Sequence, residues 1–376
     1  MTSVVVIGGG IVGASTANHL ARAGAEVTVI DRAQAGKATL AGAGIVCPWA
    51  SEADDGPWLD LYIRGASYYR ELLDELGVGD AEPKLGYRRV GALVVSNEGD
   101  DLDAAEERIA RRSGDGADLG LDVAGDVGEV SRLDNTEARA LFPPLRTGLD
   151  ALHISGGARV DGRLLAEALL ERSDVARVVS PARADLLVDG SRVAGVRVGL
   201  DTVVADAVVV AGGAWTNDVL APLGLGEPID VEPQKGQILH LGLTVDTSRW
   251  PVLLPPGPHY LLAFDDGRVV VGATRETGSG FDTRVTAAGQ AEVLDTALSI
   301  APGLANAELL ETRVGLRPLA AGLPSLGPVP GVDGLWVGTG LGPAGLTIGP
   351  VFGRALADLV LDRPPVFPVE DFAPVR

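Results

Sequence analysis

The chain has a single cysteine, Cys47, so it can form no internal disulfide and offers no cysteine cluster for zinc. Its four histidines show no metal-ligand spacing, and we therefore expect no metal site. Only 31 Lys and Arg residues stand against 51 Asp and Glu residues, and the resulting net charge of −20 argues against nucleic acid or an anionic membrane as a partner.

Long apolar runs are also missing. None reaches the roughly 18 residues that a membrane-spanning helix needs, and no positively charged segment precedes the first apolar run. We therefore expect a cytoplasmic protein without a membrane span. The 376 residues, 46% of them hydrophobic, are enough for two domains or for one domain with a large insertion.

A nucleotide-binding pattern opens the chain. The β-branched run SVVVI is followed by Gly8-Gly9-Gly10-Ile11-Val12-Gly13, a run of helix formers and a second strand that ends at Asp31. In such a unit Gly8 permits a tight turn, Gly10 lets a pyrophosphate approach, and Gly13 lets helix and strand pack closely. The helix N-terminus attracts phosphate, and Asp31 can accept hydrogen bonds from ribose hydroxyls. The pattern predicts a dinucleotide, either NAD or FAD.

Two later stretches favour FAD. The strand 205–215 ends in small residues just before Trp215, which brings backbone close to something bulky. A glycine-rich loop from Gly338 to Gly349 leads into a helix near the C-terminus. A helix N-terminus there suits the pyrimidine end of a flavin, which gains negative charge on reduction, whereas NAD needs no such site.

The remaining segments are read more coarsely. We expect an exposed helix and then a loop over 100–130, a helix over 162–172 capped by Asp161, and strands from 228 to 274. A helix over 289–303, a strand over 334–340 and a helix over 350–362 complete the prediction.

Arg317 is the only charged residue in VGLRPLAAGLPSLGPVPG, residues 314–331. A lone guanidinium among apolar residues is costly unless something negative meets it. The residues by themselves do not say whether that partner is a structural acid or a ligand.

The order of several motifs resembles the D-amino-acid-oxidase-like flavoenzymes, which include glycine oxidase, D-amino acid dehydrogenases and sarcosine oxidases. These motifs are IGGGIVG, VIDR, ATLAGAGIVCP, GARVDGRLLAEAL, VVVAGGAW, EPQKGQ, HYLLAFDDGRVVVGATRE, GLRP and GTGLGPAGLTIGP. The resemblance implies an α/β fold in which a Rossmann-like FAD-binding domain is interleaved with a mixed-sheet substrate domain. It assigns residues 1–80, 150–215 and 325–376 to the FAD domain, and 81–149 and 216–324 to the substrate domain.

The resemblance also implies roles for single residues. Arg317 would clamp the carboxylate of the substrate in a two-bond fork, and the Tyr260 hydroxyl would support the same carboxylate. Cys47 and Trp49 would lie at the mouth of the substrate cavity, although for Cys47 we favour the role of a small buried hydrophobe. The FAD site would comprise Gly8, Gly10, Ile11, Val12, Gly13, Asp31, Arg32, Thr39, Ala43, Gly44, Ile45, Arg183, Ala211, Gly212, Trp215, Gly340, Leu341, Gly342, Gly345, Leu346 and Thr347.

Two positions depart from the family pattern. Leu341 stands where many members have a histidine, and Cys47 lies in the wrong part of the chain for a covalent flavin link, so we expect non-covalent FAD. Arg275 lies where it can border the substrate cavity. Pointing inward it would favour an acidic or polar substrate side chain, but we expect it to point outward and to pair with Glu276.

The resemblance implies oxidative deamination of a small amino acid, either a D-amino acid or glycine. A hydride passes from the α carbon to flavin N5, the imino acid hydrolyses to a keto acid, and oxygen or another acceptor takes the electrons. Three alternatives stay open: oxidation of a secondary amine such as sarcosine or a cyclic imino acid, a 2-hydroxy-acid dehydrogenase with His259 as base, and a flavin-binding subunit of a larger complex. The chain could also form a homo-oligomer.

Overall fold

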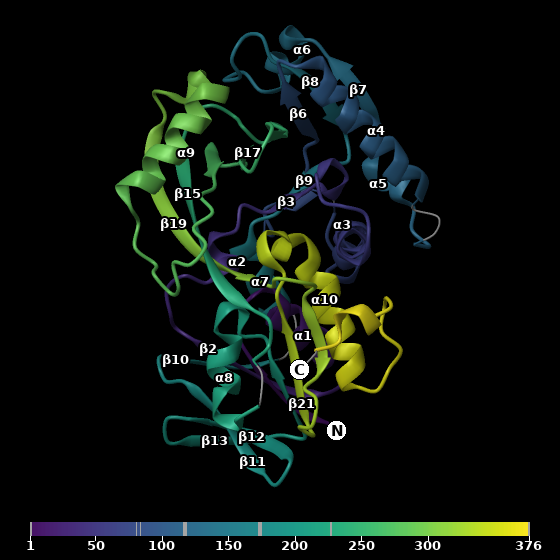
Figure 1. Ribbon diagram of the computed structural model, residues 1–376, viewed down its shortest axis with the longest axis vertical. Coiled ribbons are helices and arrows are strands. Elements are labelled where there is room, and N and C mark those ends of the chain that lie inside the picture. Colours follow the sequence, from purple (N-terminus) through teal and green to yellow (C-terminus); the bar gives the residue numbers. More distant parts are fainter. Residues whose placement is uncertain are drawn as a thin grey trace.

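The computed structural model describes residues 2–79, 81–82, 84–115, 119–171, 175–225 and 228–374. Two large sheets organise these residues, a six-stranded one in the lower half of Figure 1 and an eight-stranded one in the upper half. Helices α1 and α10 lie between them in this view (Figure 1).

The six-stranded sheet is parallel except for its last strand. Its order is β10 (Ala176–Ser180), β2 (Glu26–Arg32), β1 (Ser3–Ile7), β14 (Ala207–Val210), β21 (Leu335–Thr339) and β20 (Ser325–Pro328). The central strand β1 is apolar on both faces, as a covered parallel strand must be. Val4 and Val6 face one hydrophobic cluster, and Val5 and Ile7 face another.

Helices α1 (Ile11–Arg22) and α10 (Gly345–Val360) pack on one face of this sheet and against each other. Helix α7 (Gly162–Glu171) packs on α1, and α3 (Pro57–Glu75) packs on α10. A three-stranded antiparallel sheet made of β11 (Ala184–Asp189), β12 (Arg192–Val198) and β13 (Asp201–Val204) packs on the other face. As expected, Asp161 caps α7, because its carboxylate accepts a hydrogen bond of 3.0 Å from the Arg163 backbone N–H. Residue 172, the expected last residue of this helix, lies outside the described residues.

The start of α10 corrects the sequence prediction. The expected loop up to Gly349 is helical from Gly345, and Pro350 lies inside the helix. A proline lacks the N–H that would bond to the carbonyl of Leu346, and the Tyr69 hydroxyl donates to that carbonyl instead, at 2.6 Å. A Cβ on Gly349 would lie 2.7 Å from the Ile11 side chain, so this glycine serves close packing of α10 on α1 and not a turn.

The eight-stranded sheet is antiparallel apart from the β16–β6 pair. Its order is β19 (Glu308–Leu319), β15 (Glu232–Gly242), β18 (Arg268–Gly272), β17 (Tyr260–Ala263), β16 (Val252–Leu254), β6 (Ala92–Ser96), β8 (Asp150–Ile154) and β7 (Val130–Leu133). A small four-stranded sheet consists of β3 (Ile45–Val46), β9 (Ala158–Arg159), β5 (Tyr87–Arg89) and β4 (Ala81–Glu82). In the sequence, β4 and β5 come just before β6 of the eight-stranded sheet, and β9 comes just after β8.

Further helices flank the sheets. Helix α9 (Ala287–Ile300) packs on β15 and β18, and α4 (Gly99–Asp115) packs on β6 and β8. The second half of the acidic segment, expected to be loop, also contains α5 (Val123–Val127) and the start of β7. The short helices α2 (Ala38–Ala41), α6 (Asn135–Leu141) and α8 (Thr216–Leu220) complete the set among the described residues. None of the helices in this part of the chain combines the length and apolarity that a membrane crossing requires.

The division into two domains stays a prediction. The six-stranded sheet takes all its strands from the ranges expected for the FAD domain, and the eight-stranded sheet takes all but β8 from the other ranges. The boundary expected at residue 150 is therefore misplaced for the sheets, because β8 pairs with β6 and β7. Residue 80, at another expected boundary, lies outside the described residues.

Candidate active site

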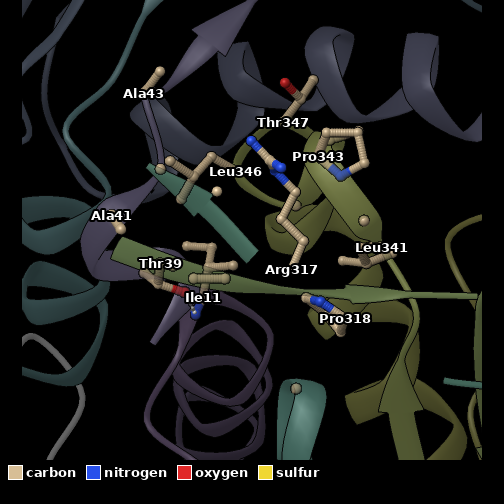
Figure 2. A pocket seen from close by; sticks show the side chains of 18 of the residues that line it. Ile11, Thr39, Ala41, Ala43, Arg317, Pro318, Leu341, Pro343, Leu346 and Thr347 are labelled. Atoms are coloured by element: carbon tan, nitrogen blue, oxygen red, sulfur yellow. Dashed lines mark hydrogen bonds between the residues drawn. The ribbon is translucent and has the colours of Figure 1, made fainter. Parts of the chain in front are cut away.

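A cavity of about 1170 Å³ connects the nucleotide-binding pattern to the eight-stranded sheet. Its lining includes Gly8 to Val12 after β1, residues 338–339 and 341–347 around the start of α10, and Tyr260 and Arg317. Ten of the lining residues are labelled in Figure 2. The topology thus brings segments from both ends of the sequence to one space.

The glycine turn is built as its spacing predicted. Gly8 has φ +110°, and a Cβ there would lie 2.3 Å from the carbonyl oxygen of Ala211. A Cβ on Gly13 would lie 1.8 Å from the Gly8 carbonyl oxygen, so helix α1 can cross the turn only without a side chain at this position. Gly13 itself does not line the cavity. Gly10 does line it. The nearest atom to a Cβ built on Gly10 is the Thr39 hydroxyl oxygen, 3.2 Å away.

Thr39, a residue of α2, lies beside the N-terminus of α1. Its hydroxyl oxygen accepts a hydrogen bond of 3.0 Å from the Ile11 backbone N–H, and Figure 2 shows the two residues in contact. No acidic residue lies in the first turn of α1, so the positive end of the helix dipole faces the cavity uncompensated. This end of the cavity is suited to phosphate groups.

Asp31 ends β2 and lines the same end of the cavity. Its carboxylate pairs with Lys37 at 2.8 Å, a partner that sequence reasoning missed although Lys37 is one of three lysines in the chain. Arg32 and Arg183 also line the cavity, and Arg183 pairs with Asp185 at 3.0 Å. The pair with Lys37 leaves Asp31 oxygen atoms able to accept further hydrogen bonds.

The middle of the cavity is lined by backbone-rich segments. Gly44 has φ +87°, and a Cβ there would lie 1.7 Å from the Val160 carbonyl oxygen. Trp215 stacks on Phe281, with 5.6 Å between the ring centroids. The predicted residues that line this part are Ala43, Gly44, Ile45, Ala211, Gly212 and Trp215.

The C-terminal glycine segment also lines the cavity. Leu341, Gly342, Gly345, Leu346 and Thr347 all border the cavity, whereas Gly340 does not. A Cβ on Gly340, which has φ +92°, would point at the backbone of Pro324, 3.0 Å away. The Thr347 hydroxyl donates to the Ile45 carbonyl at 2.8 Å and ties the start of α10 to the 43–45 segment.

Arg317 extends from β19 into the cavity, on the side where Figure 2 shows Leu346 and Thr347. Its guanidinium donates to neutral oxygens only, at 3.0 Å to the Thr274 carbonyl and at 3.3 Å to the Gln234 side chain. Among the described residues no carboxylate comes within 4.0 Å of it. Gly236 makes room for it, because a Cβ there would lie 2.5 Å from the guanidinium. Burial lowers the pKa of Arg317, but an arginine stays charged at neutral pH.

Tyr260 lies beside Arg317 at the start of β17 and also lines the cavity. Burial raises the pKa of the Tyr260 hydroxyl, while the charge of Arg317 and a hydrogen bond from it oppose the rise. The phenol therefore stays protonated at neutral pH and can donate a hydrogen bond. A fixed guanidinium and a phenol O–H at one place are suited to bind a carboxylate.

The three residues expected in the substrate pocket lie in different places. Cys47 is buried and lines the cavity, and burial raises the pKa of its thiol to about 12, so it is neither a thiolate nor a nucleophile at neutral pH. Trp49 was predicted at the cavity mouth, but it belongs to the hydrophobic core and does not line the cavity. Arg275 is exposed and borders the cavity, and Glu276, its expected partner, pairs with Lys235 at 3.2 Å.

Comparison with known proteins decides the family. Residues 3–359 match the family described as DAO, FAD dependent oxidoreductase. The chain belongs to this family. It is 47% identical to the Bacillus subtilis oxidoreductase YurR over 96% of both chains, and 33% identical to glycine oxidase of Pseudomonas aeruginosa over 99% of this chain and 98% of that protein. The solved structure of iminodiacetate oxidase from Chelativorans sp. BNC1 is 52% identical, with a TM-score of 0.91 over 99% of this chain and 98% of that one.

Membership confirms the resemblance drawn from the motifs, the α/β fold class and the FAD dependence. The protein is an FAD-dependent oxidoreductase. The geometry fits this cofactor, because the glycine turn leaves the cradle at Gly10 open and two helix N-termini border one cavity of about 1170 Å³. Gly10, Thr39 and Asp31 would hold the dinucleotide end, and the segment 341–347 would hold the flavin end.

Sequence reasoning missed several cavity residues of this oxidoreductase. Tyr62 and Trp58 reach the cavity from α3, and Arg108 reaches it from α4. Burial raises the pKa of the Tyr62 hydroxyl to about 12, which keeps it a hydrogen-bond donor. Nothing in the local pattern of these helices marks those positions, because each is one of several residues on an amphipathic helix.

Proposed function

We propose that this protein oxidises the C–N bond of a small secondary amino acid, an N-substituted glycine, whose carboxylate binds Arg317 and Tyr260. The observation that carries the proposal is the charged guanidinium in the cavity with only neutral oxygens as partners. Such a charge needs an anion, and a planar fork fixes both the position and the orientation of a carboxylate. The likeness to iminodiacetate oxidase supports a secondary amine as the second half of the substrate.

The chain contributes binding and orientation to this reaction. Arg317 and the Tyr260 hydroxyl hold the carboxylate, so that the adjacent C–H bond has one fixed direction in the cavity. FAD, when bound, accepts the hydride that leaves the substrate carbon. The amine proton goes to water, a C=N bond forms, and hydrolysis of that bond yields a 2-oxo acid and an amine. These reaction steps require no acid–base residue of the protein when the neutral amine is the form that reacts.

Glycine or a D-amino acid is the second candidate substrate, and the 33% identity to a glycine oxidase favours it.

A 2-hydroxy acid would need a base for its hydroxyl proton. His259 lines the cavity, and burial lowers its pKa, so it is neutral at pH 7. Its Nε2 lies 3.7 Å from Glu292.

The test is anaerobic mixing of the FAD-loaded protein with panels of N-substituted glycines, primary D- and L-amino acids, and 2-hydroxy acids. Loss of the visible flavin absorbance is expected with iminodiacetate or sarcosine, at rates well above those with glycine or any hydroxy acid. Faster bleaching by a primary amino acid would move the function to the second candidate. If no carboxylate-bearing amine bleaches the flavin, the substrate role of Arg317 is wrong, and a subunit that needs a partner chain becomes the better explanation.

We further expect FAD to be bound without a covalent link. Leu341 offers no nucleophile, and the Cys47 thiol is protonated at neutral pH. Acid precipitation should therefore release all the flavin into the supernatant, and the mass of the denatured chain should equal that of its sequence. A chain heavier by the mass of FAD would contradict this prediction.

A further inference from the structure

Like Arg317, Arg275 lies on the cavity wall and has no carboxylate of the described residues within 4.0 Å. Five arginines line the cavity, and among the described residues only Arg183 has a carboxylate within 4.0 Å. The four carboxylates that also line it, Asp31, Glu52, Asp101 and Asp218, do not come within 4.0 Å of Arg275. The chain carries 20 more acidic than basic residues, so the missing ion pair does not reflect a shortage of carboxylates.

The neighbours of Arg275 fix the direction of its side chain. Thr274 and Glu276 point to the same side, since the Thr274 hydroxyl donates to the Glu276 carboxylate at 2.7 Å. On that side Glu276 meets Lys235 at 3.2 Å and Gln237 at 2.7 Å. The backbone of Glu276 is bridged to that of Lys235 by two hydrogen bonds of 2.9 and 3.2 Å. In extended backbone successive side chains alternate, so Arg275 is directed to the opposite side, toward the cavity.

Arg275 also belongs to the wall that holds Arg317. Its charge acts on Tyr260, His259 and Arg317, and it adds to the burial that lowers the pKa of Arg317. The Thr274 carbonyl that accepts from Arg317 is in the residue next to Arg275. Two guanidinium groups thus face one space, and no carboxylate of the described residues comes within 4.0 Å of either. A ligand with two negative groups would relieve their repulsion.

We infer that Arg275 binds a second carboxylate of the substrate, so that the preferred substrate is a dicarboxylic secondary amine with its first carboxylate on Arg317 and Tyr260. The inference rests on the proposed function for the role of Arg317. It assigns Arg275 as the residue that distinguishes dicarboxylic from monocarboxylic substrates. A charge-assisted hydrogen bond of this kind corresponds to a preference of about 10- to 150-fold.

Equilibrium binding tests this without turnover. The FAD-loaded protein is titrated calorimetrically with diglycolate, which has two carboxylates and an ether oxygen in place of the oxidisable N–H, and with methoxyacetate, which has one carboxylate. Diglycolate is expected to bind at least tenfold more tightly to the wild type. In R275Q this advantage is lost while methoxyacetate binding is unchanged, and R275K restores part of it. Arg284, which is 84% exposed and does not line the cavity, provides the matched control R284Q.

Kinetics supply the second readout. R275Q is expected to lower kcat/KM for iminodiacetate at least tenfold relative to that for sarcosine. Equal binding of the two probes by the wild type, an equal loss for both in R275Q, or loss of the advantage in R108Q instead would overturn the inference. If the wild type prefers diglycolate through Arg275 but bleaches with no amine, the proposed oxidation fails while the dicarboxylate site stands.

Discussion

Replacing Arg317 by glutamine is expected to lower kcat/KM for the amino-acid substrate by about 30- to 5000-fold, the cost of leaving a partly buried carboxylate without its cation. Glutamine retains a hydrogen-bond donor but neither the charge nor the fork. The loss should appear mainly in KM if Arg317 serves binding alone, and in kcat as well if it sets the direction of the C–H bond. Steady-state kinetics with the best substrate of the panel measure both.

Two variants make this prediction specific. Arg313 lies on the same strand, pairs with Glu311 and does not line the cavity, so R313Q should keep wild-type kinetics. R317K keeps the charge without the planar fork, and its activity should fall between those of R317Q and the wild type. Since Arg317 also donates to Gln234 and to the Thr274 carbonyl, FAD content and thermal stability are measured for each variant. A loss in R317Q no larger than that in R313Q would refute the carboxylate clamp.

The glycine turn gives the second large effect. In G13A the new Cβ would lie 1.8 Å from the Gly8 carbonyl oxygen, so strand β1 and helix α1 must separate. We expect the free energy of unfolding to fall by about 3 kcal/mol, the upper part of the range for overpacking, with loss of bound FAD. Urea unfolding of the FAD-free protein, followed by circular dichroism, measures the stability change.

Gly10 separates the cofactor role from the folding role. Its φ of −72° is allowed for alanine, and the nearest atom to the new Cβ is the Thr39 hydroxyl at 3.2 Å. G10A should therefore be nearly as stable as the wild type but should bind FAD about 5- to 150-fold more weakly, because the methyl group projects into the cradle. Equal FAD affinity in G10A and the wild type would show that the cradle does not receive the cofactor at Gly10.

The glycine residues near the C-terminus show where local reading fails. Their spacing suggested a loop up to Gly349, with the helix starting at Pro350. The helix nevertheless starts at Gly345, because packing on α1 requires glycine at 349, and because Tyr69 satisfies the carbonyl that Pro350 leaves free. Neither partner is near this segment in the sequence.

Arg275 and Trp49 show the same limit at the site. The sequence offered Glu276 as the nearest acid for Arg275, but an adjacent residue in extended backbone points to the opposite side, and Lys235 holds that acid. Trp49 follows Cys47 by two residues and was expected beside it, yet its short 3₁₀ turn (Pro48–Ala50) buries the indole in the core. The direction of a side chain depends on the backbone that carries it.

The sequence by itself determined what is encoded over short distances: the βαβ unit with its Gly8, Gly10 and Gly13, the Asp161 cap, and an arginine among apolar residues that needs an anion. The order of its motifs was also enough for the family and for FAD. Only the tertiary structure decided that β8 joins the eight-stranded sheet, that Lys37 pairs with Asp31, and that Arg275 and Arg317 share one wall. The place of β8 and the shared wall depend on sheet pairing between residues far apart in the sequence, and the Lys37–Asp31 pair depends on the course of the backbone between β2 and α2, so no local pattern records them.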